Sequence, residues 1–137
     1  MRALDELIDC YESITPEGVS RLASLYATDA LFKDPFNEVR GQAAIAKIFS
    51  HMFTQVEAPR FKVVERMQAD NAAMLVWEFS FGPANKRRLI RGATHLKFDS
   101  AGAVCVHRDY WDAAEELYAK VPVLGWLMAG LRRLVAA

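Results

Sequence analysis

The hydrophobic pattern of the chain changes its period after Ala58-Pro59, and this change limits the possible folds more than any other feature. Before it, apolar residues recur at helical spacing, whereas after it apolar and polar residues alternate as in β-strands. The alternating part predicts four long strands, at about 61–69, 72–81, 87–98 and 103–111. Because the turns between them are short, we expect an antiparallel meander.

The part before this change predicts three helices and one short strand. The helices lie at about 4–14, 15–26 and 42–54, and the strand lies at 30–34. In that strand Phe32 and Asp34 share a face. A last helix is predicted to begin near Asp112 and to be broken around Pro122. This order predicts an α+β fold in which a curved sheet wraps around the N-terminal helices, with helices added at the C-terminus.

Length and composition favour one domain. A chain of 137 residues with 53% hydrophobic content can bury one core. We therefore expect a single domain over 1–137, with its core at about 3–112 and a C-terminal helical extension at 112–135.

Charge and hydropathy exclude several partners. Seventeen basic residues balance seventeen acidic ones, which argues against nucleic acid as a partner. The longest apolar stretch, 121–131, is shorter than a membrane-spanning helix, so no integral membrane segment is expected. Acidic residues interrupt the first ten positions where an export signal would be apolar, so the predicted location is cytoplasmic.

Strand alternation sorts the side chains of the last strand into two faces. It places Cys105, His107, Asp109 and Trp111 on one face, and Val104, Val106, Arg108 and Tyr110 on the other. The second set is half apolar although it is predicted to face outward. We therefore expect a homodimer that forms through the outer face of the sheet.

Several polar residues are candidates for acid–base chemistry, each with a structural alternative. Asp34 is either a carboxylate in an apolar pocket or a turn residue before Pro35. Asp109 forms a pair either with His107, on the same strand face, or with an arginine such as Arg40 or Arg91.

Tyr11 is either a hydrogen-bond donor to a ligand or a core residue whose hydroxyl finds an internal partner. The other two histidines, His51 and His95, are predicted to be structural or on the surface. No set of His, Asp and Glu has metal-ligand spacing, so no metal is expected, and Cys10 and Cys105 are predicted to be reduced thiols.

Three stretches resemble the superfamily of ketosteroid isomerases, SnoaL-like polyketide cyclases and nuclear transport factor 2. They are LASLYATDALFKDPF (22–36), GATHLKFDSAGAVCVHRDYWD (92–112) and the helix that contains Tyr11. The resemblance implies a cone-shaped α+β fold with a pocket between sheet and helices. It also implies that Asp34 is a general base and Tyr11 an oxyanion donor, while Thr94 occupies the position of the isomerases' acidic donor.

The segment HRDYWD (107–112) also resembles the limonene-epoxide hydrolase-like enzymes. That resemblance implies that Asp109 activates water together with an arginine and a second aspartate. The positions that would supply these partners fall in the row formed by Trp77, Phe79 and Phe81, which carry no charge.

Together these observations predict a protein that binds a small hydrophobic molecule. The predicted wall of its pocket comprises Phe32, Phe49, Phe53, Trp77, Phe79, Thr94 and Trp111. One hypothesis is an isomerase, cyclase or hydrolase that uses Asp34, Asp109, His107 and Tyr11 without a cofactor. The alternatives are a non-catalytic ligand-binding or interaction module of the same fold, and an epoxide hydrolase in which Asp109 activates water.

Overall fold

The computed structural model describes residues 2–116, and most of the predicted C-terminal extension lies outside these residues. The helices are α1 (Arg2–Glu12), the 3-10 helix η1 (Pro16–Gly18), α2 (Val19–Ser24), α3 (Gln42–Gln55) and α4 (Ala113–Glu116). The strands are β1 (Tyr26–Lys33), β2 (Glu38–Arg40), β3 (Arg60–Gln68), β4 (Ala72–Phe81), β5 (Arg88–Phe98) and β6 (Val104–Tyr110).

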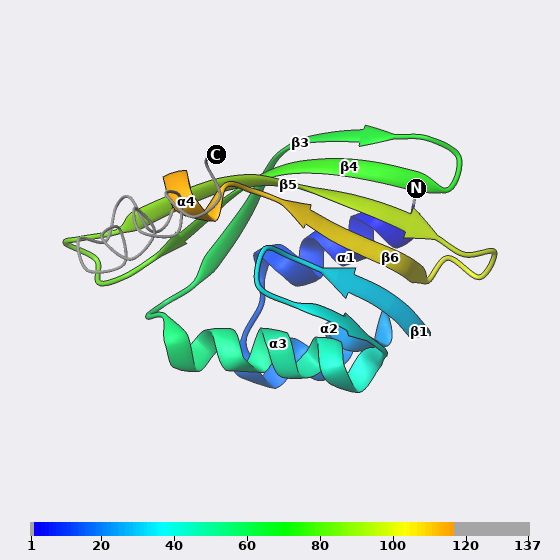
Figure 1. Cartoon of the computed structure of the whole chain (residues 1–137), viewed down its shortest axis with the longest axis horizontal. Coiled ribbons are helices and arrows are strands. Elements are labelled where there is room, and N and C mark those ends of the chain that lie inside the picture. The colour runs from blue at the N-terminus through cyan, green and yellow to red at the C-terminus, as the bar shows by residue number, and fades with distance from the viewer. Residues whose placement is uncertain (1, 117–137) are drawn as a thin grey trace, which may run out of the picture.

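The six strands form one sheet in the order β2-β1-β6-β5-β4-β3. The strands β3 to β6 form the predicted antiparallel meander. Beyond β6 the sheet continues with β1, which pairs in parallel, and with β2, which forms a hairpin with β1. The curved sheet arches over α3, and α1 also packs beneath the sheet (Figure 1). The α+β fold expected from the sequence is thus confirmed, although the complete sheet is mixed.

The predicted second helix is too long at its C-terminal end. It is predicted to run through Tyr26, but α2 ends at Ser24 and Tyr26 begins β1. Backbone pairing explains the difference, because Val104 N–H donates to Leu25 O at 3.0 Å and so draws this segment to the edge of β6. A local helical pattern is overridden here by a contact with a residue distant in the sequence.

A register shift between Lys97 and Phe98 corrects one prediction about the last strand. Such an irregularity reverses the alternation of side chains at the start of the strand. As a result Val104, predicted to face outward, is 1% exposed and belongs to the core. Arg108 and Tyr110, which follow the shift, are exposed as predicted.

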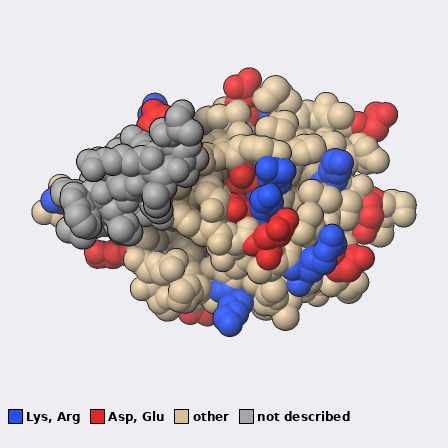
Figure 2. Space-filling view, in the orientation of Figure 1, with Lys and Arg blue, Asp and Glu red and all other residues tan. Residues whose placement is uncertain are grey.

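The core lies between the inner face of the sheet and the three main helices. Leu4 and Leu7 from α1, Leu22 from α2, Ile45 from α3 and Leu75 from β4 are at most 1% exposed. Acidic and basic side chains are interspersed over the surface seen in Figure 2, without a large patch of one sign. Among residues 2–116, none of the helices has the length and hydropathy needed to cross a bilayer.

Candidate functional site

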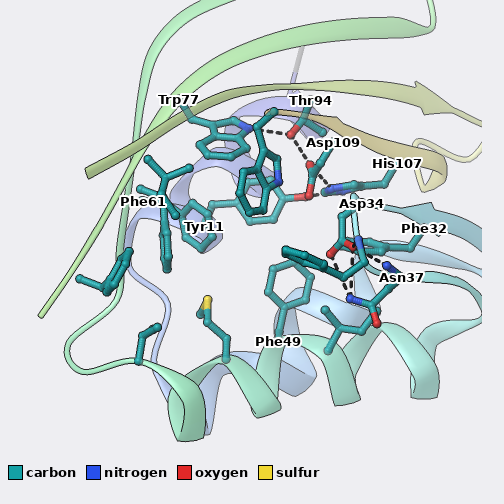
Figure 3. A pocket seen from close by; sticks show the side chains of 18 of the residues that line it. Tyr11, Phe32, Asp34, Asn37, Phe49, Phe61, Trp77, Thr94, His107 and Asp109 are labelled. Atoms are coloured by element: carbon teal, nitrogen blue, oxygen red, sulfur yellow. Dashed lines mark hydrogen bonds and ion pairs between the residues drawn. The ribbon is translucent and has the colours of Figure 1, made fainter. Parts of the chain in front are cut away.

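A cavity of about 740 Å³ lies between α3 and the inner face of the sheet. Aromatic side chains form a large part of its wall; they are Tyr11, Phe32, Phe36, Phe49, Phe61, Trp77, Phe79, Phe81 and Trp111. A volume of this size is typical of sites for small organic molecules. Figure 3 shows the polar side chains gathered beneath the sheet and the aromatic rings on the remaining sides.

The predicted wall agrees with this cavity except at Phe53. Phe53 is partly buried and packs against the core, but it is not among the lining residues. Phe53 lies one helical turn after Phe49, which lines the cavity, so it stands at the edge of the face that α3 turns to the cavity. His51, predicted to be structural or on the surface, is exposed and contributes to the lining.

His107 is the centre of a buried hydrogen-bond network at the sheet end of the cavity. Its Nε2 lies 2.7 Å from Asp109 Oδ1, and its Nδ1 lies 2.8 Å from the Tyr26 hydroxyl and 3.2 Å from the Tyr11 hydroxyl. The two tyrosine hydroxyls also hydrogen-bond to each other. The imidazole is 3% exposed and thus shielded from solvent.

The direction of the hydrogen bonds on the Asp109 side follows from the donors available. The Trp77 indole can only donate, so its Nε1–H donates to Thr94 Oγ1 at 2.7 Å. Thr94 therefore uses its own proton to donate to Asp109 Oδ1 at 2.6 Å. Thr94 was predicted to donate to a ligand, but in the structure its proton supports Asp109 instead.

The two tyrosines on the other side of His107 stay protonated over the ordinary pH range. Burial raises the pKa of Tyr11 and that of Tyr26 well above the usual value for a phenol. In the tautomer with the proton on Nε2, His107 accepts from the Tyr26 hydroxyl at Nδ1, and the Tyr26 oxygen then accepts from Tyr11. Tyr11 is thus a core residue whose hydroxyl has internal partners, and it also lines the cavity. That it donates to a ligand stays a prediction.

The strand register explains how distant residues meet at this point. Thr94 on β5 is the cross-strand partner of Asp109 on β6, and Phe32 on β1 is the parallel partner of His107. The Phe32 ring stacks on the imidazole, with 4.3 Å between the ring centroids. Tyr26 joins the network because it lies on β1. The helical spacing of the sequence places Tyr26 at the end of a helix, so the sequence alone does not predict its place in the network.

Asp34 is both a turn residue and a part of the cavity wall, the two positions between which its sequence context left a choice. Its Oδ1 accepts from the backbone N–H of Phe36 at 2.8 Å and of Asn37 at 2.6 Å, which makes it the first residue of the β1–β2 turn. The Asn37 side chain donates to the same carboxylate. Asp34 also lines the cavity together with Asp109. Whether it acts as a base stays a prediction.

Within residues 2–116 Asp109 pairs with His107 rather than with an arginine. Arg91 lies 3.3 Å from Glu116, and Arg40 donates to the backbone oxygen of Asp29. Among the described lining residues there is neither lysine nor arginine. The epoxide hydrolase hypothesis requires an arginine between two acids, and residues 2–116 do not contain this arrangement.

No group of three or more His, Cys, Asp or Glu side chains within residues 2–116 could hold a metal ion. Cys10 and Cys105 are free thiols, as expected. Among the described lining residues, the titratable groups are the carboxylates of Asp34 and Asp109, the imidazoles of His51 and His107 and the hydroxyl of Tyr11.

Gly92 gives the Trp77 indole the space that it needs to reach Thr94. An alanine Cβ at Gly92, the cross-strand partner of Trp77, would lie 2.5 Å from Trp77 Cη2 and 3.0 Å from Trp111 Cβ. We expect Gly92→Ala to lower the free energy of unfolding by about 1–3 kcal/mol, because both tryptophans must move. Chemical denaturation followed by tryptophan fluorescence measures this change.

Gly18→Ala is the matched control for Gly92→Ala. Its backbone φ is −86°, and the nearest neighbour of an added Cβ is the Thr15 hydroxyl at 3.3 Å. If Gly92→Ala were as stable as wild type with an unchanged tryptophan spectrum, the tight packing of Trp77 on Gly92 would be disproved.

Comparison with solved structures supports the fold. A hypothetical protein with a ketosteroid isomerase-like fold from Catenulispora acidiphila, solved in complex with trimethylamine, has a TM-score of 0.71 at 13% identity, covering 84% of this chain and 88% of that one. A putative SnoaL-like polyketide cyclase from Shewanella putrefaciens has a TM-score of 0.67 at 18% identity, covering 85% and 83%. TerC, co-crystallised with polyporic acid, has a TM-score of 0.69 at 13% identity, covering 83% and 92%.

Sequence comparison gives the family. No curated protein matches the chain. The model of the SnoaL-like domain matches residues 7–107, which include Tyr11, Tyr26, Asp34, Thr94 and His107. At identities below 20% the structural neighbours show the fold alone, but the family match covers most of the sequence. The chain therefore belongs to the SnoaL-like domain family.

Proposed function

We propose that this protein binds an apolar small molecule in the aromatic cavity and acts on its polar group by general acid–base catalysis. The observation that carries the proposal is the buried network centred on His107, which ends at the cavity in Asp109 and Tyr11. A carboxylate and a phenol at one end of an apolar cavity form a proton acceptor and a donor close together. Two of the structural neighbours were solved with small molecules, which supports such a role for this fold.

In the proposed reaction Asp109 accepts a proton from the ligand. Both hydrogen bonds that Asp109 accepts go to Oδ1, so within the described part of the chain Oδ2 has no hydrogen-bonding partner. His107 and Thr94 hold the carboxylate in place. Isomerisation, aldol-type cyclisation and elimination next to a carbonyl group begin with such a proton transfer.

Tyr11 is the proposed donor to the ligand oxygen on which negative charge develops. When Tyr26 donates to His107, the Tyr11 hydroxyl can turn from Tyr26 to that oxygen. A hydrogen bond aimed at a developing oxyanion is typically worth about 10²–10³ in rate. The sum of charges in the cavity is unchanged during this step, because the carboxylate loses its charge as the ligand gains one.

A non-catalytic ligand-binding protein is the second candidate. Tyr26, Thr94 and both ring nitrogens of His107 have hydrogen-bond partners inside the protein, which favours this candidate. A network that only stabilises the fold has the same property. Rate measurements separate the two candidates, because a binding protein takes up an apolar molecule without accelerating proton transfer.

A generic probe tests the proposal without knowledge of the natural substrate. In 5-nitrobenzisoxazole a base removes the carbon-bound proton, the N–O bond breaks, and a nitrile and a coloured phenolate form. We expect the wild-type protein to accelerate this elimination with saturation kinetics. A rate equal to that with an equal concentration of acetate would contradict catalysis. Native mass spectrometry of the purified protein would separately reveal a co-purified ligand.

We also propose the homodimer expected from the sequence. On the outer face, Tyr110 is 48% and Leu89 40% exposed, and the Arg108 guanidinium lies 4.8 Å from the Tyr110 ring centroid. Exposed apolar groups on the back of a sheet favour association. Analytical ultracentrifugation distinguishes a dimer from a monomer of 15.4 kDa.

A further inference from the structure

Asp34 and Asp109 lie side by side at the end of two neighbouring strands. In the parallel register of β1 and β6, Lys33 pairs with Arg108, so Asp34 and Asp109 follow next to each other. Both side chains line the cavity. Figure 3 shows the two residues on the same side of the cavity, next to His107. Two carboxylates therefore face the same space.

Among the described residues nothing of opposite charge faces these carboxylates across the cavity. The lining contains neither lysine nor arginine, and its basic side chains are those of His51 and His107. If His107 is protonated, it balances Asp109 but leaves the charge of Asp34. The hydrogen bonds at Asp34 come from uncharged amides. In an apolar cavity, unbalanced negative charge attracts a cation and repels an anion.

Two aromatic rings of the cavity wall lie two residues after these acids in the sequence. Phe36 belongs to the turn that Asp34 begins, and Trp111 is two residues after Asp109. These two rings meet edge to face, with centroids 5.6 Å apart and planes at 72°. Both line the cavity. Ring faces next to carboxylates are the surroundings that organic ammonium groups favour, because the ring quadrupole and the carboxylate charge both attract a cation.

From this arrangement we propose that the ligand of the cavity carries a substituted ammonium group, which binds between Asp34 and Asp109 and against the corner formed by Phe36 and Trp111. This inference rests on the proposed function, since it names the class of ligand for the same cavity. Carboxylic acids of the same size are excluded by repulsion. The apolar remainder of the ligand lies along the wall formed by Phe49, Phe61 and Phe79.

Three probes that share a benzyl group and differ in charge test this preference. Benzyltrimethylammonium is positive, neopentylbenzene is its neutral isostere, and phenylacetate is negative. Titrations followed by tryptophan fluorescence, which reports on Trp77 and Trp111, give the three dissociation constants. We expect the cation to bind about tenfold more tightly than the neutral isostere, and the anion to bind more weakly than both.

Variants and salt show whether the acids cause the preference. In Asp34→Asn combined with Asp109→Asn, the cation and its isostere should bind within about twofold of each other, because the charges are gone and the shapes are kept. Asp70→Asn, at an exposed turn position, should keep the tenfold ratio. In the wild-type protein, added salt should weaken the binding of the cation and leave that of the neutral isostere nearly unchanged.

The outcomes distinguish this inference from the proposed function. Equal binding of the cation and its isostere by the wild-type protein, with elimination of 5-nitrobenzisoxazole intact, would overturn the ammonium preference alone. Binding of none of the three probes, with no elimination, would overturn both. The salt measurement needs no variant, so the inference stays testable even if the double variant does not fold.

Discussion

An Asp109→Asn variant is expected to eliminate 5-nitrobenzisoxazole at least about 100-fold more slowly than the wild-type protein. Asparagine keeps an oxygen that accepts from Thr94 and His107, so the network is preserved. The substitution removes the negative charge and the basicity of the Asp109 side chain. The decrease should appear in kcat, with KM changed by less than about threefold, because the probe is uncharged.

Two further variants make this result specific. Asp70→Asn removes an exposed carboxylate outside the cavity and should leave the rate unchanged. Asp34→Asn tests the other candidate base. A large loss in Asp34→Asn with a normal rate in Asp109→Asn would transfer the role of base to Asp34. Normal rates in both variants would leave no carboxylate base in this cavity.

The second large effect is a loss of stability at alkaline pH. Burial raises the pKa of Tyr11 and of Tyr26 in the folded state, while in the unfolded chain both ionise near pH 10. Above that pH the unfolded state binds fewer protons than the folded state, so the free energy of unfolding falls as pH rises. Each tyrosine contributes about 1.4 kcal/mol per pH unit, or about 2.8 kcal/mol per unit for the pair. Below about pH 9 these two tyrosines do not make the free energy of unfolding depend on pH.

Urea denaturation at several pH values between about 9 and 11.5 measures this slope. Tyr11→Phe and Tyr26→Phe should each remove about half of the tyrosine contribution. Tyr110→Phe is the matched control, because Tyr110 is 48% exposed and should leave the slope unchanged. The same slope in wild type and in both buried-tyrosine variants would mean that Tyr11 and Tyr26 are not held neutral in the core.

Much of the fold could be predicted because the signals for it are local. The meander from β3 to β6 follows from alternation and short turns, and α1 and α3 follow from helical periodicity. The parallel pairing of β1 with β6 could not be predicted in the same way, because it depends on a contact between positions about 80 residues apart. The helix predicted through Tyr26 was wrong for that reason.

The candidate site was predicted in part. Alternation placed His107 and Asp109 on one face, and the pair forms. The role of Thr94 as a support for Asp109 depends on the β4–β5–β6 register, and that of Tyr26 depends on β1 pairing with β6. Neither register can be read from one strand alone. The cytoplasmic location and the single domain over 1–137 stay predictions.

The most direct test of the account is the ¹⁵N spectrum of the imidazole groups during titration with 2-tetralone, a neutral apolar ketone. The protein has three histidines, so the signals are few, and His95 is predicted to lie on the opposite face of the sheet. We predict that the ring nitrogens of His107 shift with the same saturation as the tryptophan fluorescence, while those of His95 stay in place. Saturable binding that leaves His107 unchanged would contradict the claim that its network forms the reactive end of the cavity.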